Sequence, residues 1–146
     1  MNMEELANRL QAMEDLEAIK KMHRQYIAYL DNLEFEKALD LFIDDATVEV
    51  RNSGPMKGKD SFSKIYLGTL KNNMDRNESH IVGQSILNVD GDTASGHWIV
   101  FILFSVPQVE WVTGRNDCEY VKVNGQWKFK RLKFTRTNAS KPELFP

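Results

Sequence analysis

Residues 16–31 read LEAIKKMHRQYIAYLD, and this stretch decides the fold. Its apolar and aromatic side chains recur every three or four residues, which predicts a helix with one buried stripe. That stripe consists of Leu16, Ile19, His23, Tyr26, Ile27 and Leu30. Asp31 follows at the carboxyl end, where the helix dipole disfavours a negative charge unless a partner holds it. We therefore expect a helix that covers a sheet, with Asp31 at the mouth of a pocket between them.

The segments around this stretch predict two more helices and a short strand. Residues 3–14 are rich in Glu, Leu, Ala and Gln, so the first helix is expected to begin there. Further on we expect a short helix at about 34–42, a strand at 47–50 and a third helix from 62 to about 74.

After residue 78 the apolar period changes to two, which indicates strands. The predicted strands are 79–89, 93–106, 109–123 and 126–137. Asp90-Gly91 and Asn124-Gly125 are typical of tight hairpin turns, so the four strands form an antiparallel meander. Strands this long usually belong to a strongly bent sheet. We predict an α+β domain spanning residues 1–146, with three N-terminal helices on that sheet.

Two strands carry details that bear on a site. In the last strand the alternation slips by one, which predicts a β-bulge near Lys130–Arg131 and turns Arg136 inward. Residues 98–104 are apolar on both faces, so one face needs a cover, and we expect a homodimer or homotrimer formed through the sheet. The residues expected to line the pocket are Trp98, Ile102, Leu132 and Phe134.

Composition excludes several classes of protein. The chain has 146 residues, 42% hydrophobic and 27% charged, which suits one globular domain with a real core. Its formal charge of −2 and the lack of a stacking platform argue against nucleic acid as a partner. No apolar run approaches the ~20 residues of a membrane span, and no signal peptide is recognisable. With a single cysteine, Cys118, we expect a cytoplasmic protein.

The order of elements resembles the NTF2-like fold, also called SnoaL-like or cystatin-like, and several strings carry the resemblance along nearly the whole chain. They are residues 26–31 (YIAYLD), 41–46 (LFIDDA), 78–82 (ESHIV), 90–96 (DGDTASG), 114–120 (GRNDCEY) and 125–128 (GQWK). The sequence is most similar to the branch with scytalone dehydratase, hexachlorocyclohexane dehydrochlorinase and bile-acid 7α-dehydratase. The resemblance implies a cone-shaped fold with a pocket for a small molecule.

The resemblance also implies which residues act. In that branch an Asp at the end of the first helix and a His at the start of a meander strand form a catalytic dyad, which implies Asp31 and His80 here. Bile-acid dehydratase further uses a Tyr and an Arg that match Tyr26 and Arg136. Its Asp on the second meander strand is replaced here by Ile102 or a neighbouring apolar residue, which implies a more apolar pocket.

Elimination of water or halide requires a base near neutral pH and a group that stabilises developing negative charge. Histidine suits the first task, and a carboxylate at its other ring nitrogen fixes the tautomer. The Tyr26 hydroxyl and the Arg136 guanidinium suit the second. The sequence shows no metal-ligand spacing, so neither a metal nor an organic cofactor is expected. We predict a cofactor-independent lyase acting on a small, mostly apolar ring compound.

Each residue also has a simpler interpretation. Asp31 could cap the second helix, and His80 could bond to backbone or solvent at the start of its strand. Tyr26 could be a core residue with a paired hydroxyl, and Arg136 could belong to a basic surface edge. His23 is expected to be a satisfied core histidine.

Other functions stay open at this level, because the fold alone does not give a function. A non-catalytic binding or oligomerisation module would have an apolar pocket with Asp31 and His80 too far apart to bond. An enzyme that resembles ketosteroid isomerase would need a second buried acid on the meander, for which the sequence offers no good candidate.

Overall fold

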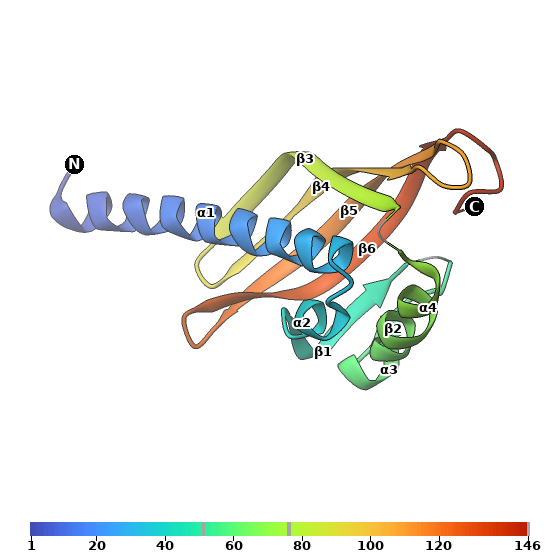
Figure 1. Cartoon of the computed structure of the whole chain (residues 1–146). Coiled ribbons are helices and arrows are strands. Elements are labelled where there is room, and N and C mark those ends of the chain that lie inside the picture. The colour runs from blue at the N-terminus through green and yellow to red at the C-terminus, as the bar shows by residue number, and fades with distance from the viewer. Residues whose placement is uncertain (51, 76, 146) are drawn as a thin grey trace.

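The fold is α+β, as predicted, with helices packed on one curved sheet (Figure 1). A computed structural model describes residues 1–50, 52–75 and 77–145. The helices are α1 (Met3–Asp31), α2 (Phe35–Leu39), α3 (Lys59–Lys64), the π-helical segment η1 (Ile65–Leu70) and α4 (Lys71–Asn73). The strands are β1 (Phe42–Glu49), β2 (Met56–Lys57), β3 (Glu78–Asp90), β4 (Thr93–Phe104), β5 (Glu110–Val123) and β6 (Gln126–Ala139).

The predicted meander forms most of the sheet. The strand order is β2-β1-β6-β5-β4-β3, and β3 to β6 pair antiparallel with their sequence neighbours. β1 lies parallel to β6, which the sequence did not predict because this pairing joins residues 84–87 positions apart. β1 also begins at Phe42, five residues before the predicted strand, so Asp44 and Asp45 lie within the strand.

The predicted bulge in the last strand is confirmed, and a second one follows it. Glu119 pairs with Arg131 while Tyr120 pairs with Phe129, so Lys130 is the extra residue. A further shift lies between Thr113 and Gly114 of β5. Because bulges increase the local bend of a strand, they help the sheet to curve over the helices.

The helices differ from prediction mainly in their boundaries. α1 is one continuous helix of 29 residues, and α2 has only five residues rather than the predicted nine. The predicted third helix is divided into α3, η1 and α4. The π-helical segment presents Tyr66 and Leu70 to the interior, where both are buried.

An aromatic cluster fills the space between the helices and β1, β5 and β6. Its rings contact one another edge-on, tilted or, for Phe42 and Phe129, stacked, at centroid distances of 4.9–6.3 Å, and such pairs are stabilising. The members include Tyr26, Phe42, Phe62, Tyr66, Tyr120 and Phe129. This cluster fixes the position of the second half of α1, and therefore of Asp31 at its end.

Within the described residues, no helix is long and apolar enough to cross a membrane. In the same part of the chain, no group of three or more His, Cys, Asp or Glu side chains is placed to hold a metal ion.

Candidate active site

A mostly apolar cavity lies between the carboxyl half of α1 and the concave face of the sheet. The cavity is small and partly open to solvent. Its lining residues come from α1, η1, the strands β3 to β6, the positions just after β1 and α4, and the C-terminal tail: Tyr26, Ile27, Leu30, Val50, Tyr66, Leu70, Met74, His80, Val100, Ile102, Asn116, Leu132, Phe134 and Phe145. The predicted lining residues Ile102, Leu132 and Phe134 are therefore part of this wall.

Asp31 and His80 meet at the edge of the cavity. The His80 Nδ1 atom lies 2.8 Å from Asp31 Oδ1, and the His80 backbone N–H donates to both carboxylate oxygens at 3.1 and 3.2 Å. A carboxylate can only accept, so Nδ1 carries the hydrogen and Nε2 is the basic nitrogen of the neutral ring. These bonds also explain how a negative charge is held at the carboxyl end of α1.

The capping interpretation of Asp31 is wrong. The N-cap residue of α2 is Glu34, whose cap involves no side-chain hydrogen bond. The Asp31 carboxylate bonds across to β3 instead, 49 residues along the chain.

A second carboxylate, which the sequence reasoning missed, lies near the other ring nitrogen. Glu78 Oε2 is 3.6 Å from His80 Nε2, and the Glu78 side chain is only 6% exposed. Glu78 and His80 are two residues apart on β3 and share its inner face, as the alternation of the strand requires. That alternation was the available signal, because an acid two residues before an inward histidine must point inward too.

Two tyrosine hydroxyls form a second polar feature of the cavity wall. Tyr26 Oη and Tyr66 Oη are 2.5 Å apart, and both residues line the cavity. Burial raises the pKa of both hydroxyls, so both keep their protons at neutral pH. One hydroxyl donates to the other, which leaves one O–H free to donate elsewhere. Tyr26 was predicted as a site residue from the sequence, whereas Tyr66 was not.

Asn116 joins the cavity wall to a buried polar cluster beneath it. Its Nδ2 lies 3.3 Å from His23 Nε2, and His23 Nδ1 lies 2.9 Å from Tyr120 Oη. Trp98 donates to the same Tyr120 oxygen at 3.0 Å and stacks on the His23 ring. Burial lowers the pKa of His23 to about 3, so the ring is neutral. His23 is thus the satisfied core histidine that was predicted, and Trp98 belongs to this cluster rather than to the cavity wall.

Arg136 does not contribute its guanidinium to the cavity. Its Nη1 donates to the carbonyl oxygens of Pro142 at 2.8 Å and Leu144 at 3.0 Å. The tail held in this way places Phe145 edge-on to Phe134, where it closes part of the cavity. The sequence predicted that Arg136 points into the site, whereas its guanidinium bonds to the tail. The sequence gives no sign of where the tail folds back.

The comparison with known proteins identifies the family. The model of the SnoaL-like domain matches residues 11–133. The chain belongs to the SnoaL-like family. This confirms the resemblance seen in the sequence, although none of the proteins with curated functions matches the chain.

Solved structures support the same fold for this SnoaL-like protein. A scytalone dehydratase-like protein from Novosphingobium aromaticivorans has a TM-score of 0.79 at 24% identity, over 90% of each chain. A hexachlorocyclohexane dehydrochlorinase from Novosphingobium barchaimii has a TM-score of 0.79 at 18% identity, over 93% of this chain and 96% of that one. At such identities the likeness shows the NTF2-like, cystatin-like fold and no more.

Proposed function

We propose that this SnoaL-like protein is a cofactor-independent lyase of dehydratase or dehydrochlorinase type. Its substrate would be a small, mostly apolar ring compound that enters the cavity. The observation that carries the proposal is the 2.8 Å hydrogen bond between Asp31 and His80 at the edge of that cavity. A non-catalytic module has no need of a carboxylate that fixes the tautomer of a cavity-lining histidine.

In the proposed reaction, His80 Nε2 takes a proton from a C–H bond next to the leaving group. The electron pair of that C–H bond forms the double bond, and the leaving group departs with the electrons of its own bond. Asp31 fixes the orientation of the ring through Nδ1 and holds the imidazolium that results. General-base help of this kind is typically worth ~10²–10⁴-fold, so other groups must contribute as well.

The tyrosine pair is the best candidate for the second contribution. Its free O–H, in a cavity with few polar groups, can stabilise a departing halide or give its proton to a departing hydroxyl. When the leaving group is a hydroxyl, the tyrosine loses its proton to form water. The proton that His80 took from the substrate then returns the tyrosinate to its neutral form. The Asn116 amide is a further polar group in the wall and would orient an oxygen of the substrate.

The relatives support the reaction class. The structures that share the fold include one named for scytalone dehydratase and others named as hexachlorocyclohexane dehydrochlorinases. Loss of water and loss of HCl are both eliminations that begin with a proton taken from carbon. In the proposed reaction of this chain, His80 likewise removes a proton from carbon.

The test is an elimination assay with scytalone and hexachlorocyclohexane as probes, followed by absorbance and chloride release. We expect turnover of at least one probe, and we expect His80→Ala and Asp31→Asn each to reduce it by about 10²–10⁴-fold. Both variants should remain folded, because neither removes a large part of the aromatic core. His97→Ala is the matched control, since His97 lies on β4 away from the cavity.

A turnover rate of His80→Ala close to that of the wild type would contradict the mechanism. If a probe raises the melting temperature by binding but is not turned over, the second candidate is supported instead, namely a non-catalytic binding module. The thermal shift and the rate are thus measured on the same samples.

A further inference from the structure

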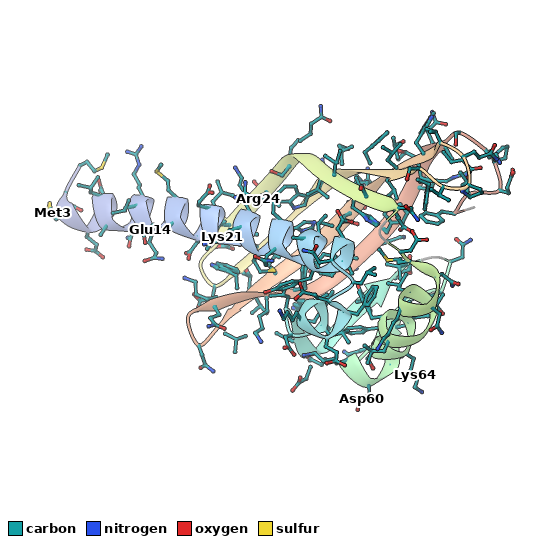
Figure 2. The ribbon with its side chains drawn as sticks, in the orientation of Figure 1. Met3, Glu14, Lys21, Arg24, Asp60 and Lys64 are labelled. Carbon is teal, nitrogen blue, oxygen red and sulfur yellow. The ribbon has the colours of Figure 1, made fainter. Side chains whose placement is uncertain are left out.

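The first part of α1 projects beyond the rest of the protein. Figure 1 shows the blue end of the helix running past the tips of the β-hairpins, and Figure 2 shows Met3 and Glu14 on this projecting part. Every residue up to Glu14 is exposed, and burial begins at Asp15. We refer to residues 3–14 as the arm.

The arm is held as a helix at both ends. At its root, the buried carboxylate of Asp15 accepts from Lys122 at 2.7 Å and from Trp127 Nε1 at 3.1 Å, both at the β5–β6 hairpin. At its tip, the Asn2 side chain caps the backbone N–H of Glu5 at 2.8 Å. A free peptide of this length would be marginal as a helix, but here the ordering is already provided by the fold.

The large apolar side chains of the arm form one stripe. Met3, Leu6, Leu10 and Met13 are 50–78% exposed and follow the spacing of three, four and three that defines the a and d positions of a coiled coil. At 3.6 residues per turn, this stripe lies roughly 140° around the helix from the face that carries Ile19 and His23. The stripe is therefore not a continuation of the core-facing side and points away from the chain's own sheet.

We propose that the arm pairs with the arm of a second copy of this chain in a parallel, two-stranded coiled coil. In this register Arg9 occupies position g and Glu14 occupies position e, five residues on. A parallel pair places each Arg9 beside Glu14 of the second copy, twice by symmetry. An antiparallel pair aligned on the same seam would place Arg9 beside Arg9, which is repulsive.

The same register explains where the pairing ends. The next two seam positions are Glu17 and Lys20, which are charged and cannot continue the apolar seam. The pairing therefore stops where the arm joins the body of the protein. Two heptads form a small interface, so the association is weak and depends on protein concentration.

Single cysteines in the arm test the pairing directly. The native Cys118 is buried, so it does not interfere with cross-linking at the surface. In a parallel pair, equivalent a positions lie about 6 Å apart between Cα atoms, within disulfide range. We expect Leu10→Cys to form a dimer under mild oxidation much faster than Asn8→Cys. Asn8 is the matched control because it is on the same arm but faces away from the seam.

A mixture of Leu6→Cys and Leu10→Cys distinguishes the two directions. Parallel arms give 6–6 and 10–10 disulfides, whereas antiparallel arms give 6–10 disulfides, and mass spectrometry separates the products. Mixed 6–10 products, or a Leu10→Cys rate no higher than that of Asn8→Cys, would overturn the proposal.

Charge exchange tests the register by sedimentation or light scattering over a range of concentrations. Arg9→Glu should raise the dimer dissociation constant by about tenfold, since two exposed pairs become repulsive. The double variant Arg9→Glu/Glu14→Arg should restore it. If the double variant associates no better than Arg9→Glu alone, the two residues do not face each other and the parallel register is wrong.

Discussion

His80 and His23 both face the interior of the protein, but the partners of their ring nitrogens differ. His80 bonds to a carboxylate through one nitrogen, and its ring lines the cavity. His23 is fully buried, with neutral partners, Tyr120 and Asn116, at its two nitrogens. The first ring can accept a proton and have the new charge compensated, whereas the second is held neutral. The role of a histidine in this fold is therefore set by the charge and solvation of its partners.

Alanine at the two positions should lower the free energy of unfolding by very different amounts, and this is the largest expected difference. His23→Ala leaves a cavity and removes the partner of two buried polar groups, so we expect it to lower the free energy of unfolding by about 3–5 kcal/mol. In His80→Ala the Asp31 carboxylate still accepts from the backbone N–H of residue 80, so the free energy of unfolding should fall by only about 1 kcal/mol. Urea denaturation measures both. Equal losses would contradict the separation of a structural from a functional histidine.

The acid dependence of stability should come largely from His23. In the unfolded chain its ring gains a proton near pH 6.5, but in the folded protein only near pH 3. Between these values the unfolded state binds more protons, so stability falls as the pH falls, by up to about 1.4 kcal/mol per pH unit. Unfolding at pH 7, 5.5 and 4.5 should show this slope in the wild type and a smaller one in His23→Gln, while the acidic residues contribute equally to both.

Asn116→Asp should give His23 a carboxylate partner, as His80 already has in Asp31. The new carboxylate would lie where Asn116 Nδ2 now lies, 3.3 Å from His23 Nε2. An adjacent negative charge favours the protonated ring, so we expect the pKa of His23 to rise from about 3 and the acid slope to flatten. Burying the charge should cost about 2 kcal/mol at pH 7. NMR titration of the ring protons measures the pKa, and Asn116→Leu controls for the loss of the amide. A His23 that still titrates near pH 3 would show that the two sites differ for another reason.

The sequence predicted the parts of this arrangement that depend on local pattern. The apolar stripe of α1, the alternation of the strands and the hairpin turns place Asp31 at a helix end and His80 at a strand start, and the resemblance paired them. The slipped alternation in β6 also located the bulge at Lys130. Each of these patterns lies within one helix, strand or turn, so it can be recognised without knowing which other elements pack against it.

The parts that were missed depend on contacts between distant segments. The parallel pairing of β1 with β6, the approach of Tyr66 to Tyr26 and the folding back of the tail onto Arg136 each join residues whose own surroundings are unremarkable in sequence. Asn116 was missed for the same reason, since a buried amide in a strand shows its function only through His23 and the cavity. Local patterns indicate which side of an element is buried, but not what lies against it.

Loss of the contact between Arg136 and the tail should change the accessibility of one histidine and not the other. Arg136→Ala removes the two hydrogen bonds that hold Pro142 and Leu144, so Phe145 should close the cavity less often. The expected cost in stability is only about 1 kcal/mol, because these bonds lie at the surface. Modification by diethyl pyrocarbonate, mapped by mass spectrometry, should become several-fold faster at His80 and stay undetectable at His23. Lys128→Ala is the matched control, since Lys128 is also on β6 and donates to a carbonyl, that of Asp40, far from the tail. Faster modification of His23 in Arg136→Ala would mean that the variant loosens the whole core. The tail would then be part of the fold that buries both rings, and the difference in solvation between them would not be set by the local partners of each ring.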